Sequence, residues 1–434
     1  MKFIKKFILN FFLYFNYKIS KINIKQEKHI KIYEEFNYKL SRLEKDIKKT
    51  LSQFFKSKKL WQKKLPFPLN NFEILPSNIF IGAFGNYGGL LTLLMANKNK
   101  LRKEKKLISF VPDYLKNNNS TLRNYFSDYV HISPHKIYSD EFIKEHQIDT
   151  GTIIEFDKFA LRLFEAKNLV EQRRKNNKGF LKLKKDHLKN GISILRKMGV
   201  KNNEKFITLH IRQLGWRGEN ISNSTEIFRT PNVENYIQAI EYLTKLNFKV
   251  ILVGNNNYKF KKIKNFINYA NSKFKSDSMD IFLAAKSEFL IGNASGFYNA
   301  AMCFGTPVLF TDVSCYSNFF FLSKNDLFLP RLLKRINSKK IIPIINCFDY
   351  PLNSIHHDNH LKKLSITVEE NSPSDITEAV KEMLKNILKK KKDSLVQKKF
   401  KKTFNNHFDK DKSKNLKLKA IANIPSFFLK KYFN

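Results

Sequence analysis

The sequence predicts an α/β protein with two Rossmann-like, doubly wound domains that face each other across a cleft. One observation behind this prediction is that short apolar runs alternate with segments of helical periodicity through both halves of the chain. The other is that each half contains a glycine-bearing turn between an expected strand and an expected helix. Because open parallel sheets bind ligands beyond the carboxyl ends of their strands, two such sheets would bind two substrates.

Size and composition fit an ordered protein of this kind. The chain has 434 residues, enough for two domains and additional tails, and 42% of them are hydrophobic. Its three cysteines, Cys303, Cys315 and Cys347, have no zinc-like spacing. An odd number of scattered cysteines favours a reducing compartment, the cytoplasm.

The chain is strongly basic, with 80 Lys and Arg residues against 38 Asp and Glu and a net charge of +42. Such a charge favours an anionic partner, which would be nucleic acid, an acidic membrane surface or a phosphorylated substrate. The sequence is also crowded with Lys, Asn, Ile and Phe, which A/T-rich codons encode, so genome composition is an alternative source of the excess. The charge is spread along the chain without a helix-turn-helix, RRM or zinc pattern, so we expect no nucleic-acid partner.

Four segments are expected along the chain. Residues 1–65 read as a basic helical N-terminal segment, 66–195 as the first Rossmann-like domain, and 200–390 as the second. Residues 391–434 are a Lys-rich tail that we expect to be mobile to about residue 425.

The first residues, "MKFIKKFILNFFLYFNY", have apolar side chains at helical spacing along one face. The run is too short to span a bilayer, which needs about 20 apolar residues, and no small-residue cleavage site follows it. A basic, Phe-rich amphipathic helix suits an anionic membrane surface, and packing on the protein itself is the alternative. The chain's end, "IPSFFLKKYFN", repeats the same aromatic and Lys chemistry.

The first domain is expected to begin with a strand, a Gly-rich turn that contains Gly85 and Asn86, and a helix. Further strands are expected at 105–113 and 151–157. A Lys-rich helical bridge then ends at Gly199.

The second domain shows the alternation more clearly. Strands are expected at 205–212, 248–255, 288–292 and 306–312, and helices at 230–247, 277–286, 296–304 and 372–388. Thr230 is the expected N-cap of the first of these helices, with Pro231 at its first position. Its core face is predicted to consist of Val233, Tyr236, Ile237, Ile240 and Leu243.

The stretch "FLIGNASGFYNAAMCFGTP" passes from a buried strand into a helix through small and polar residues. A helix N-terminus leaves backbone N–H groups unpaired and attracts anions. Gly292 and Gly296 would let the backbone approach a phosphate, and Asn293 and Ser295 would add side-chain hydrogen bonds. The alternative is an ordinary strand-to-helix turn in which Ser295 only caps.

A second set of polar residues occurs in "ITLHIRQLGWRGEN". His210 and Arg212 alternate with apolar neighbours at the end of an expected strand, and the Arg212 fork suits two phosphate oxygens. Arg217 and Arg229 follow in the next loop and are candidates for the same anion. The alternatives are a structural ion pair for Arg212, a hydrogen-bonded core position for His210, and solvated surface for the two later arginines.

Two acidic residues, Asp277 and Asp280, lie in the first turn of an expected helix. Capping and a favourable interaction with the helix dipole are one interpretation. In the other, one of the two accepts hydrogen bonds from a nucleobase or ribose.

Together, "ITLHIR", "FRTPNVENYIQAIEYLTKLNFKVILVGN" and "KSDSMDIFLAAKSEFLIGNASGFYNAAMCFGTPVLF" resemble a family of bacterial glycosyltransferases of the GT-B type. The resemblance is dense from about 205 to 312 and looser to about 388, and "IFIGAFGNYGG" is similar to the family's N-terminal Gly-rich turn. It implies two facing Rossmann-like domains, a nucleotide-sugar donor and an acceptor bound by the first domain.

More distantly, the His-x-Arg element resembles the donor site of fucosyltransferase-type enzymes. That resemblance implies that Arg212 contacts the β-phosphate, that Asp277 or Asp280 contacts the base, and that Ser295 contacts the diphosphate. The loop "QLGWRGEN" departs from the usual second Arg and Asp, which leaves the donor sugar and base open.

No metal or other cofactor is expected, because "HHDNH" at 356–360 matches no common metal-site spacing. Arginines and the helix end would therefore stabilise the leaving diphosphate. Candidates for a general base are Glu155, Asp157 and His210.

The predicted function is glycosyl transfer from a nucleoside-diphosphate sugar to a hydroxyl of a carbohydrate or lipid-linked acceptor. The resemblance implies surface polysaccharide or lipopolysaccharide synthesis in the cytoplasm, at the inner leaflet of the cell membrane. The alternatives are a basic peripheral membrane protein or a nucleic-acid-binding protein with an inactive transferase-like core.

Overall fold

The chain divides into two compact units, Met1–Phe67 and Pro68–Asn434. The computed structural model describes residues 72–74, 106–111, 119–134, 179–213, 227–255, 258–349, 351–355, 357–389, 392–409 and 420–433. All of these belong to the second unit, and the predicted N-terminal amphipathic helix lies outside the described residues.

The centre of the second unit is a six-stranded sheet in the order β6-β5-β4-β7-β8-β9, with every neighbouring pair parallel. The strands are β4 (Phe206–His210), β5 (Lys249–Val253), β6 (Phe266–Asn268), β7 (Leu290–Gly292), β8 (Val308–Val313) and β9 (Leu327–Pro330). Residues of β4, β7 and β8 are buried throughout, as expected for a parallel sheet covered on both faces. The predicted parallel, doubly wound sheet of the second domain is thus confirmed, and the edge strands β6 and β9 were not predicted.

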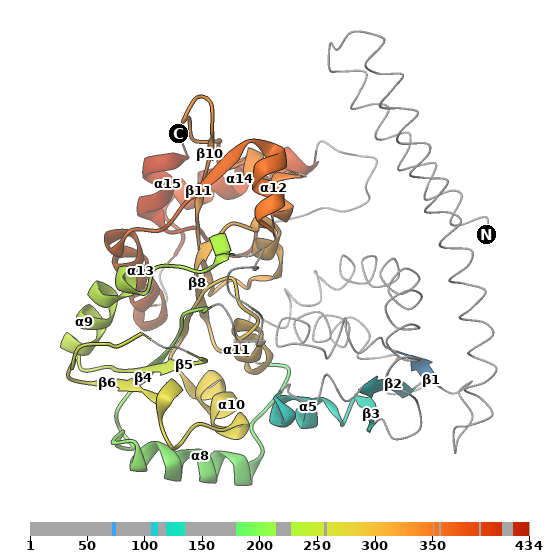
Figure 1. Ribbon diagram of the computed structural model, residues 1–434, viewed down its shortest axis with the longest axis vertical. Helices are drawn as coiled ribbons and strands as arrows, with labels where there is room; N and C mark the ends of the chain where they lie inside the picture. The colour runs from blue at the N-terminus through green and yellow to red at the C-terminus, as the bar shows by residue number, and fades with distance from the viewer. Residues whose placement is uncertain are drawn as a thin grey trace. The chain divides into compact units, whose positions relative to one another are not determined.

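The helices form two groups around this sheet (Figure 1). In one group, α9 (Ile237–Lys245) and α13 (Pro373–Lys389) pack on each other, with α9 on β5 and α13 on β8 and β9. In the other, α10 (Asp277–Lys286), α11 (Tyr298–Phe304) and α8 (Lys185–Lys197) pack together, with α11 on β7 and β8. The strand order reverses between β4 and β7, because the chain runs outward from β4 to β6 on one side and from β7 to β9 on the other. Right-handed crossovers that run in opposite directions along a sheet place their helices on opposite faces.

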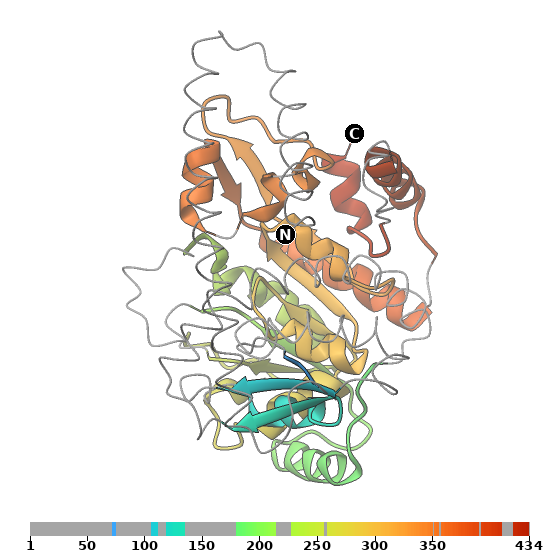
Figure 2. The same cartoon turned by 90° about the vertical axis from the view of Figure 1, so that its right-hand side faces the viewer.

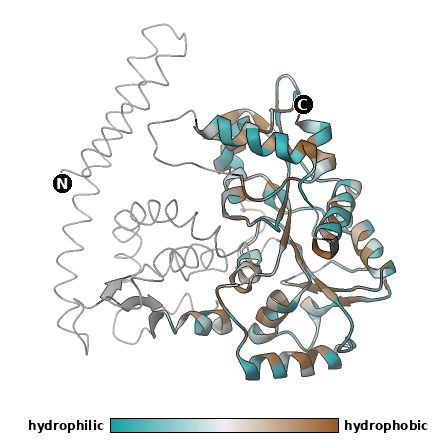
Figure 3. Cartoon of the chain, turned by 180° about the vertical axis from the view of Figure 1, so that it is seen from behind, coloured by the Kyte–Doolittle hydropathy of each residue, from teal (hydrophilic) through white to brown (hydrophobic). Residues whose placement is uncertain are grey.

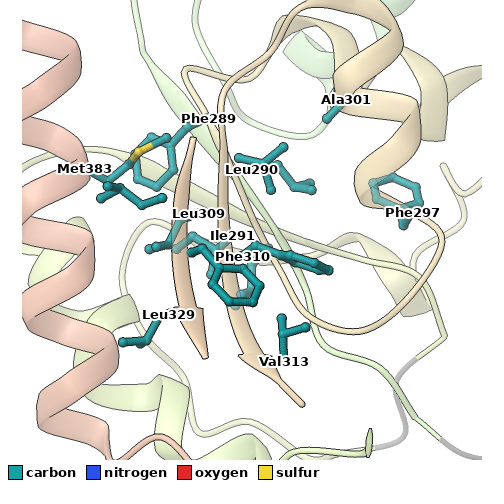
Figure 4. Close-up of a cluster of buried hydrophobic side chains, with 14 of the residues drawn as sticks. Phe289, Leu290, Ile291, Phe297, Ala301, Leu309, Phe310, Val313, Leu329 and Met383 are labelled. Carbon is teal, nitrogen blue, oxygen red and sulfur yellow. The ribbon is translucent and has the colours of Figure 1, made fainter. Parts of the chain in front are cut away.

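The core between these layers is aromatic and aliphatic (Figure 4). Phe289, Leu290 and Ile291 of the β7 segment are buried beside Phe310 of β8 and Met383 of α13. Figure 3 shows the strands as a hydrophobic centre, with hydrophilic residues on the surrounding helices. Truncating one of these phenylalanines to alanine would cost about 3–5 kcal/mol, because a cavity would replace a fully packed side chain.

The helix ends agree with the sequence in part. Gly305 closes α11 in the left-handed conformation, at φ 80°, which glycine adopts readily. The predicted N-cap Thr230 is wrong. A 3-10 turn at Val233–Tyr236 precedes α9, and the N-cap of this turn is Asn232. Of the predicted core face, Ile237 is only half-buried, while its other four members are buried.

The described part of the first half contains a three-stranded parallel sheet in the order β1-β2-β3. Its strands are β1 (Phe72–Ile74), β2 (Lys106–Val111) and β3 (Val130–Pro134), and α5 (Ser120–Phe126) lies between the last two in sequence. Strand β2 confirms the prediction at 105–113, whereas β3 was not predicted. The strand predicted at 151–157 lies outside the described residues, and the pairing of two domains across a cleft stays a prediction.

The C-terminal segment differs from its prediction. Residues expected to be mobile form α14 (Leu395–Asp409), and α15 (Ser426–Tyr432) packs against it. Phe400 and Phe404 of α14 and Phe428 and Leu429 of α15 are buried. The physical reason is that these apolar residues repeat at helical spacing, so each helix buries one face despite its lysines. Figure 2 shows the helices of this C-terminal segment in red, next to one another.

The second half also contains a two-stranded sheet and one more α-helix. Strand β10 (Leu332–Arg335) pairs antiparallel with β11 (Ile366–Glu369). The helix α12 (Asp358–Leu364) includes residues 358–360 of the segment "HHDNH".

Candidate active site at the carboxyl edge of the six-stranded sheet

The polar residues of the candidate site come from the point where the strand order reverses. His210 is the last residue of β4, and the turn at 292–296 begins at the last residue of β7. Strand β4 lies between β5 and β7 and pairs with both. In open α/β sheets this reversal leaves room beyond the strand ends, where ligands bind. The two predicted groups of residues therefore lie at one place on the sheet.

His210 lies within this edge and is enclosed on three sides. Its ring stacks on Phe297 at a centroid distance of 5.2 Å, and its Nε2 atom is 3.4 Å from the Ser295 hydroxyl. A side chain at Gly254 would meet the ring at 2.8 Å, so the left-handed residue after β5 must be glycine.

The environment of His210 keeps its imidazole neutral at pH 7. The pKa of His210 is lowered from 6.5 to about 4, mainly by burial, and the cations of Arg212 and Lys275 contribute in the same direction. Two positive side chains from different elements thus act on one ring. The Nδ1 atom of that ring is buried and has no hydrogen-bond partner among the described residues.

Arg212 directly contacts the turn after β7. Its backbone N–H donates to Asn293 Oδ1 at 3.1 Å, and its guanidinium Nη1 donates to Thr230 Oγ1 at 3.4 Å. Both Arg212 and Asn293 are buried, and the Asn293 Nδ2 group has no hydrogen-bond partner among the described residues. Arg212 therefore joins the end of β4 to the predicted phosphate-binding turn.

Ser295 is not the cap of α11, whose N-cap is Phe297 without a side-chain cap hydrogen bond. The Ser295 hydroxyl instead accepts from the backbone N–H of Phe297 at 3.3 Å, which stabilises the turn before the helix. Neither Gly292 nor Gly296 has a positive φ angle. The helix α11 starts at Tyr298 and has seven residues, so its dipole is smaller than the predicted helix at 296–304 would supply.

Two more cations approach the same edge. Arg229 lies in the 3-10 turn Ile227–Arg229, and its Nη2 donates to the Ala294 carbonyl at 2.9 Å. Lys275 donates from Nζ to the Gly254 carbonyl at 2.8 Å and also to the Asn255 side chain. Arg229 was predicted, whereas Lys275 was missed because an isolated lysine in a Lys-rich sequence carries no local signal.

Asp277 has a structural contact that neither sequence interpretation included. Its Oδ2 atom accepts from the backbone N–H of Ser120 at 2.6 Å and from the Ser120 hydroxyl at 2.8 Å. The cap of its own helix is Ser276, which accepts from the Met279 N–H at 3.2 Å. Asp277 thus fastens the start of α5 to the start of α10, and the prediction that it caps its own helix is wrong.

Asp280 is the more buried of the two acids. Burial raises the pKa of its carboxyl from 3.8 to about 6, although a hydrogen bond with Tyr269 and the charge of Lys275 oppose the shift. Its Oδ1 atom is buried and has no hydrogen-bond partner among the described residues. An unpaired acceptor at the carboxyl edge is what a donor group of a ligand would satisfy.

Five predicted site residues lie outside the described residues. They are Arg217, Gly85, Asn86 and the two candidates for the general base, Glu155 and Asp157. Among the residues that are described, no group of three or more His, Cys, Asp or Glu side chains is arranged to hold a metal ion. Within that same part of the chain, no helix has the length and apolar character needed to cross a bilayer. The three cysteines are all buried.

Comparison with known proteins returned only structural likenesses. No protein-family model and no curated protein matches the chain. It is similar to the family 9 glycosyltransferase from Veillonella parvula DSM 2008, with 9% identity, a TM-score of 0.32, and coverage of 54% of this chain and 81% of that one. It is also similar to the iron-containing dodecameric glycosyltransferase TibC from enterotoxigenic E. coli H10407, with 12% identity, a TM-score of 0.36, and coverage of 73% of this chain and 76% of that one.

A third likeness is to the heptosyltransferase TibC in complex with ADP-D-β-D-heptose, with 12% identity and a TM-score of 0.32 over 69% of this chain and 74% of that one. Because these TM-scores are low, the function of the chain has to be inferred from its own residues.

Proposed function

We propose that this protein is a glycosyltransferase that moves a sugar from a nucleoside-diphosphate donor to a hydroxyl acceptor. The supporting observation is the bond between the Arg212 backbone N–H and Asn293, because it joins the arginine and the polar turn at the point where the strand order reverses. A nucleotide diphosphate is the ligand class that such an edge of an α/β sheet commonly binds.

The chemistry of the site fits a diphosphate leaving group. Negative charge grows on the β-phosphate as the glycosidic bond breaks, and preorganised donors in a water-poor site stabilise it. Arg212 and Arg229 supply fixed guanidinium groups, and Lys275 adds a third cation. Because α11 is short, we assign this charge stabilisation mainly to the side chains, and we propose that no metal ion is required.

Two buried groups would gain a partner when the donor binds. The Asn293 amide is a donor without a hydrogen-bond partner among the described residues, which costs about 1–3 kcal/mol until an acceptor such as a phosphate oxygen fills the position. Asp280 presents an acceptor that matches the N–H groups of a base. We therefore propose Asp280, rather than Asp277, as the residue that contacts the base.

His210 serves in this proposal as a neutral hydrogen-bonding group. A histidine with a pKa of about 4 is a weak base at pH 7, so it is poorly suited to deprotonate the acceptor hydroxyl. A bound diphosphate would raise that pKa, since an adjacent anion favours the imidazolium. We propose that the general base comes from the first domain.

The cellular setting rests on the sequence. We propose that the acceptor is a carbohydrate or lipid-linked intermediate of surface polysaccharide or lipopolysaccharide synthesis, at the cytoplasmic face of the membrane. The basic, Phe-rich N-terminal segment and the net charge of +42 support this setting. The resemblance of the His-x-Arg element to fucosyltransferase-type donor sites stays a prediction.

A thermal-shift screen of the full chain against nucleotide sugars tests the function. A ligand that binds the folded state raises its stability by RT ln(1 + [L]/Kd), so the donor should raise the melting temperature above the other compounds. The matched nucleosides, which lack phosphates, should give little shift. If no nucleotide sugar shifts the melting temperature while the protein binds anionic vesicles or oligonucleotides, the core is inactive and one of the alternative functions applies.

A further inference from the structure

A buried polar cluster lies next to the candidate site, centred on Asp312 at the carboxyl end of β8. Asp312 is the extra residue of a β-bulge, because Thr311 pairs with Leu329 and Val313 pairs with Pro330. Its φ angle is 53°, in the left-handed region, and its side chain is buried. A non-glycine residue in this conformation costs about 1–3 kcal/mol and persists only where its surroundings hold it there.

Several contacts hold Asp312 in place. The Arg331 Nε group donates to its Oδ1 atom at 3.2 Å, and the Tyr236 hydroxyl donates to its Oδ2 atom at 2.8 Å. Asn371 bonds to it twice, by donating its backbone N–H to Oδ1 at 2.9 Å and accepting from the Asp312 N–H at 2.7 Å. All four residues are buried. A bulge fixed this firmly re-aims a side chain, and bulges concentrate next to active sites.

The cluster reaches the turn after β7 through two hydroxyl groups. The Tyr236 oxygen lies 2.8 Å from Thr311 Oγ1, which in turn donates to the Gly292 carbonyl at 3.1 Å. Gly292 immediately precedes Asn293, the partner of the Arg212 backbone. Because each hydroxyl has one proton and Thr311 donates its own to Gly292, the Tyr236 proton is shared between Asp312 and Thr311. The turn is therefore tied to the cluster through these two adjacent hydroxyls.

The cluster also reaches the segment that carries Arg229. Arg331 donates from Nη1 to the Phe228 carbonyl, in the same 3-10 turn as Arg229. Arg229 itself donates to Ala294 in the turn. One buried arginine thus contacts both Asp312 and the segment opposite the turn, and its Nη2 atom lies 3.6 Å from Glu370 Oε1.

We propose that Arg331, Asp312 and Tyr236 are positioning residues that set the spacing between the turn at 292–296 and the segment at 227–230. The ligand held between these two segments is a nucleoside diphosphate, and that part of the inference rests on the proposed function. These residues do not touch the ligand. They fix the geometry in which Arg229, Asn293 and Ser295 meet it.

Tyr236→Phe is the sharpest test because it removes only the hydroxyl that links Asp312 to Thr311, while the ring stays in the core. The matched control is Tyr125→Phe, which also removes a buried phenol hydroxyl. That hydroxyl lies 2.7 Å from His187 Nδ1 and 3.0 Å from the Lys184 N–H, between α5 and α8. Urea unfolding of both variants reports how much general stability each has lost.

The first measurement is amide hydrogen exchange of the unliganded full chain. In peptides that cover 289–298 and 227–230, Tyr236→Phe should speed amide exchange more than Tyr125→Phe does. The two exchange rates are compared after each is corrected for the loss of stability that urea unfolding reports. The second measurement is calorimetry with ADP, GDP, UDP and CDP. The nucleotide that binds the wild type should bind Tyr236→Phe about fivefold more weakly and Tyr125→Phe with unchanged affinity.

The outcomes separate the two proposals. Equal exchange in those peptides for both variants overturns the positioning role, whatever nucleotides bind. Faster local exchange with no nucleotide bound by the wild type keeps the positioning role and overturns the proposed ligand. Faster exchange with unchanged nucleotide affinity would mean that the cluster shapes the turn without affecting the site, and the inference would be wrong.

Discussion

Asp280→Asn should stabilise the folded protein at neutral pH. The carboxyl of Asp280 is buried near the start of α10, its Oδ1 atom has no hydrogen-bond partner among the described residues, and its pKa is raised to about 6. A raised pKa means that the folded state holds the proton more tightly than the unfolded chain. The stabilising contribution of this carboxyl is fully present below pH 3.8 and is lost as the pH rises through about 6.

The magnitude follows from the shift of the pKa. The change from 3.8 to about 6 is roughly 2 pH units, and each unit corresponds to about 1.4 kcal/mol. Wild-type protein therefore carries a penalty of about 3 kcal/mol at pH 7, which an uncharged amide of the same shape removes. The variant should be more stable than wild type by about that amount at pH 7, and by much less at pH 4.

Urea unfolding of both proteins at several pH values measures this difference. His210 contributes in the opposite direction, because its lowered pKa makes stability fall as the pH drops from 6.5 to about 4. That effect is common to both proteins and cancels when they are compared at the same pH. Asp277→Asn is the matched control, and it should not gain stability because its carboxylate accepts two hydrogen bonds from Ser120.

Two results would refute the view that the buried carboxylate charge destabilises the wild type. One is that Asp280→Asn gains no stability at pH 7, and the other is that its gain is equally large at pH 4. The same variant should bind the nucleotide donor more weakly if Asp280 accepts hydrogen bonds from the base. Residues that are retained for function commonly lower the stability of the folded protein, so a variant that gains stability and loses nucleotide binding fits this role.

Three further predictions concern the site and the membrane. Arg212→Lys should keep the melting temperature but lose transfer activity by about 100-fold, because an ammonium cannot hold two phosphate oxygens as a fork does; turnover equal to wild type would contradict the role of the guanidinium. Ser295→Ala should weaken nucleoside-diphosphate binding by roughly fivefold to tenfold in calorimetry, whereas equal affinity would limit Ser295 to its contacts with the Phe297 N–H and the His210 ring. Deleting residues 1–18 should lower sedimentation with anionic vesicles and leave the unfolding transition unchanged, and undiminished vesicle binding would exclude these residues as the anchor.

The four inner strands of the six-stranded sheet were predictable because their signals are local. Strands such as β4 and β8 are short apolar runs, and the position of α10 follows from the residues that begin and end it. The meeting of Arg212 with the turn after β7 was also predictable, since carboxyl ends of neighbouring parallel strands share an edge. These features need only the period of the pattern and the rules of parallel sheets.

The contacts that sequence reasoning missed are distant in the chain or depend on a bulge. Asp277 bonds to Ser120, 157 positions away, and nothing in either segment indicates the other. Asp312 lies near the end of the buried strand β8, and the shift in pairing between β8 and β9, where it bonds to Arg331, has no signal in the sequence. The mobility predicted for the basic tail was wrong for a different reason. Its many lysines indicated a solvated segment, although Phe400 and Phe404 are at helical spacing and are buried.

Calorimetry of the full chain in the presence of EDTA tests the central claim most directly. A series of nucleoside, monophosphate and diphosphate with the same base should bind with affinity that increases with each phosphate, and the chelator should leave the diphosphate affinity unchanged. The Arg212→Lys variant should lose most of the gain that the second phosphate gives. Equal affinity for nucleoside and diphosphate, or diphosphate binding that disappears with EDTA, would contradict a diphosphate site made of protein cations alone.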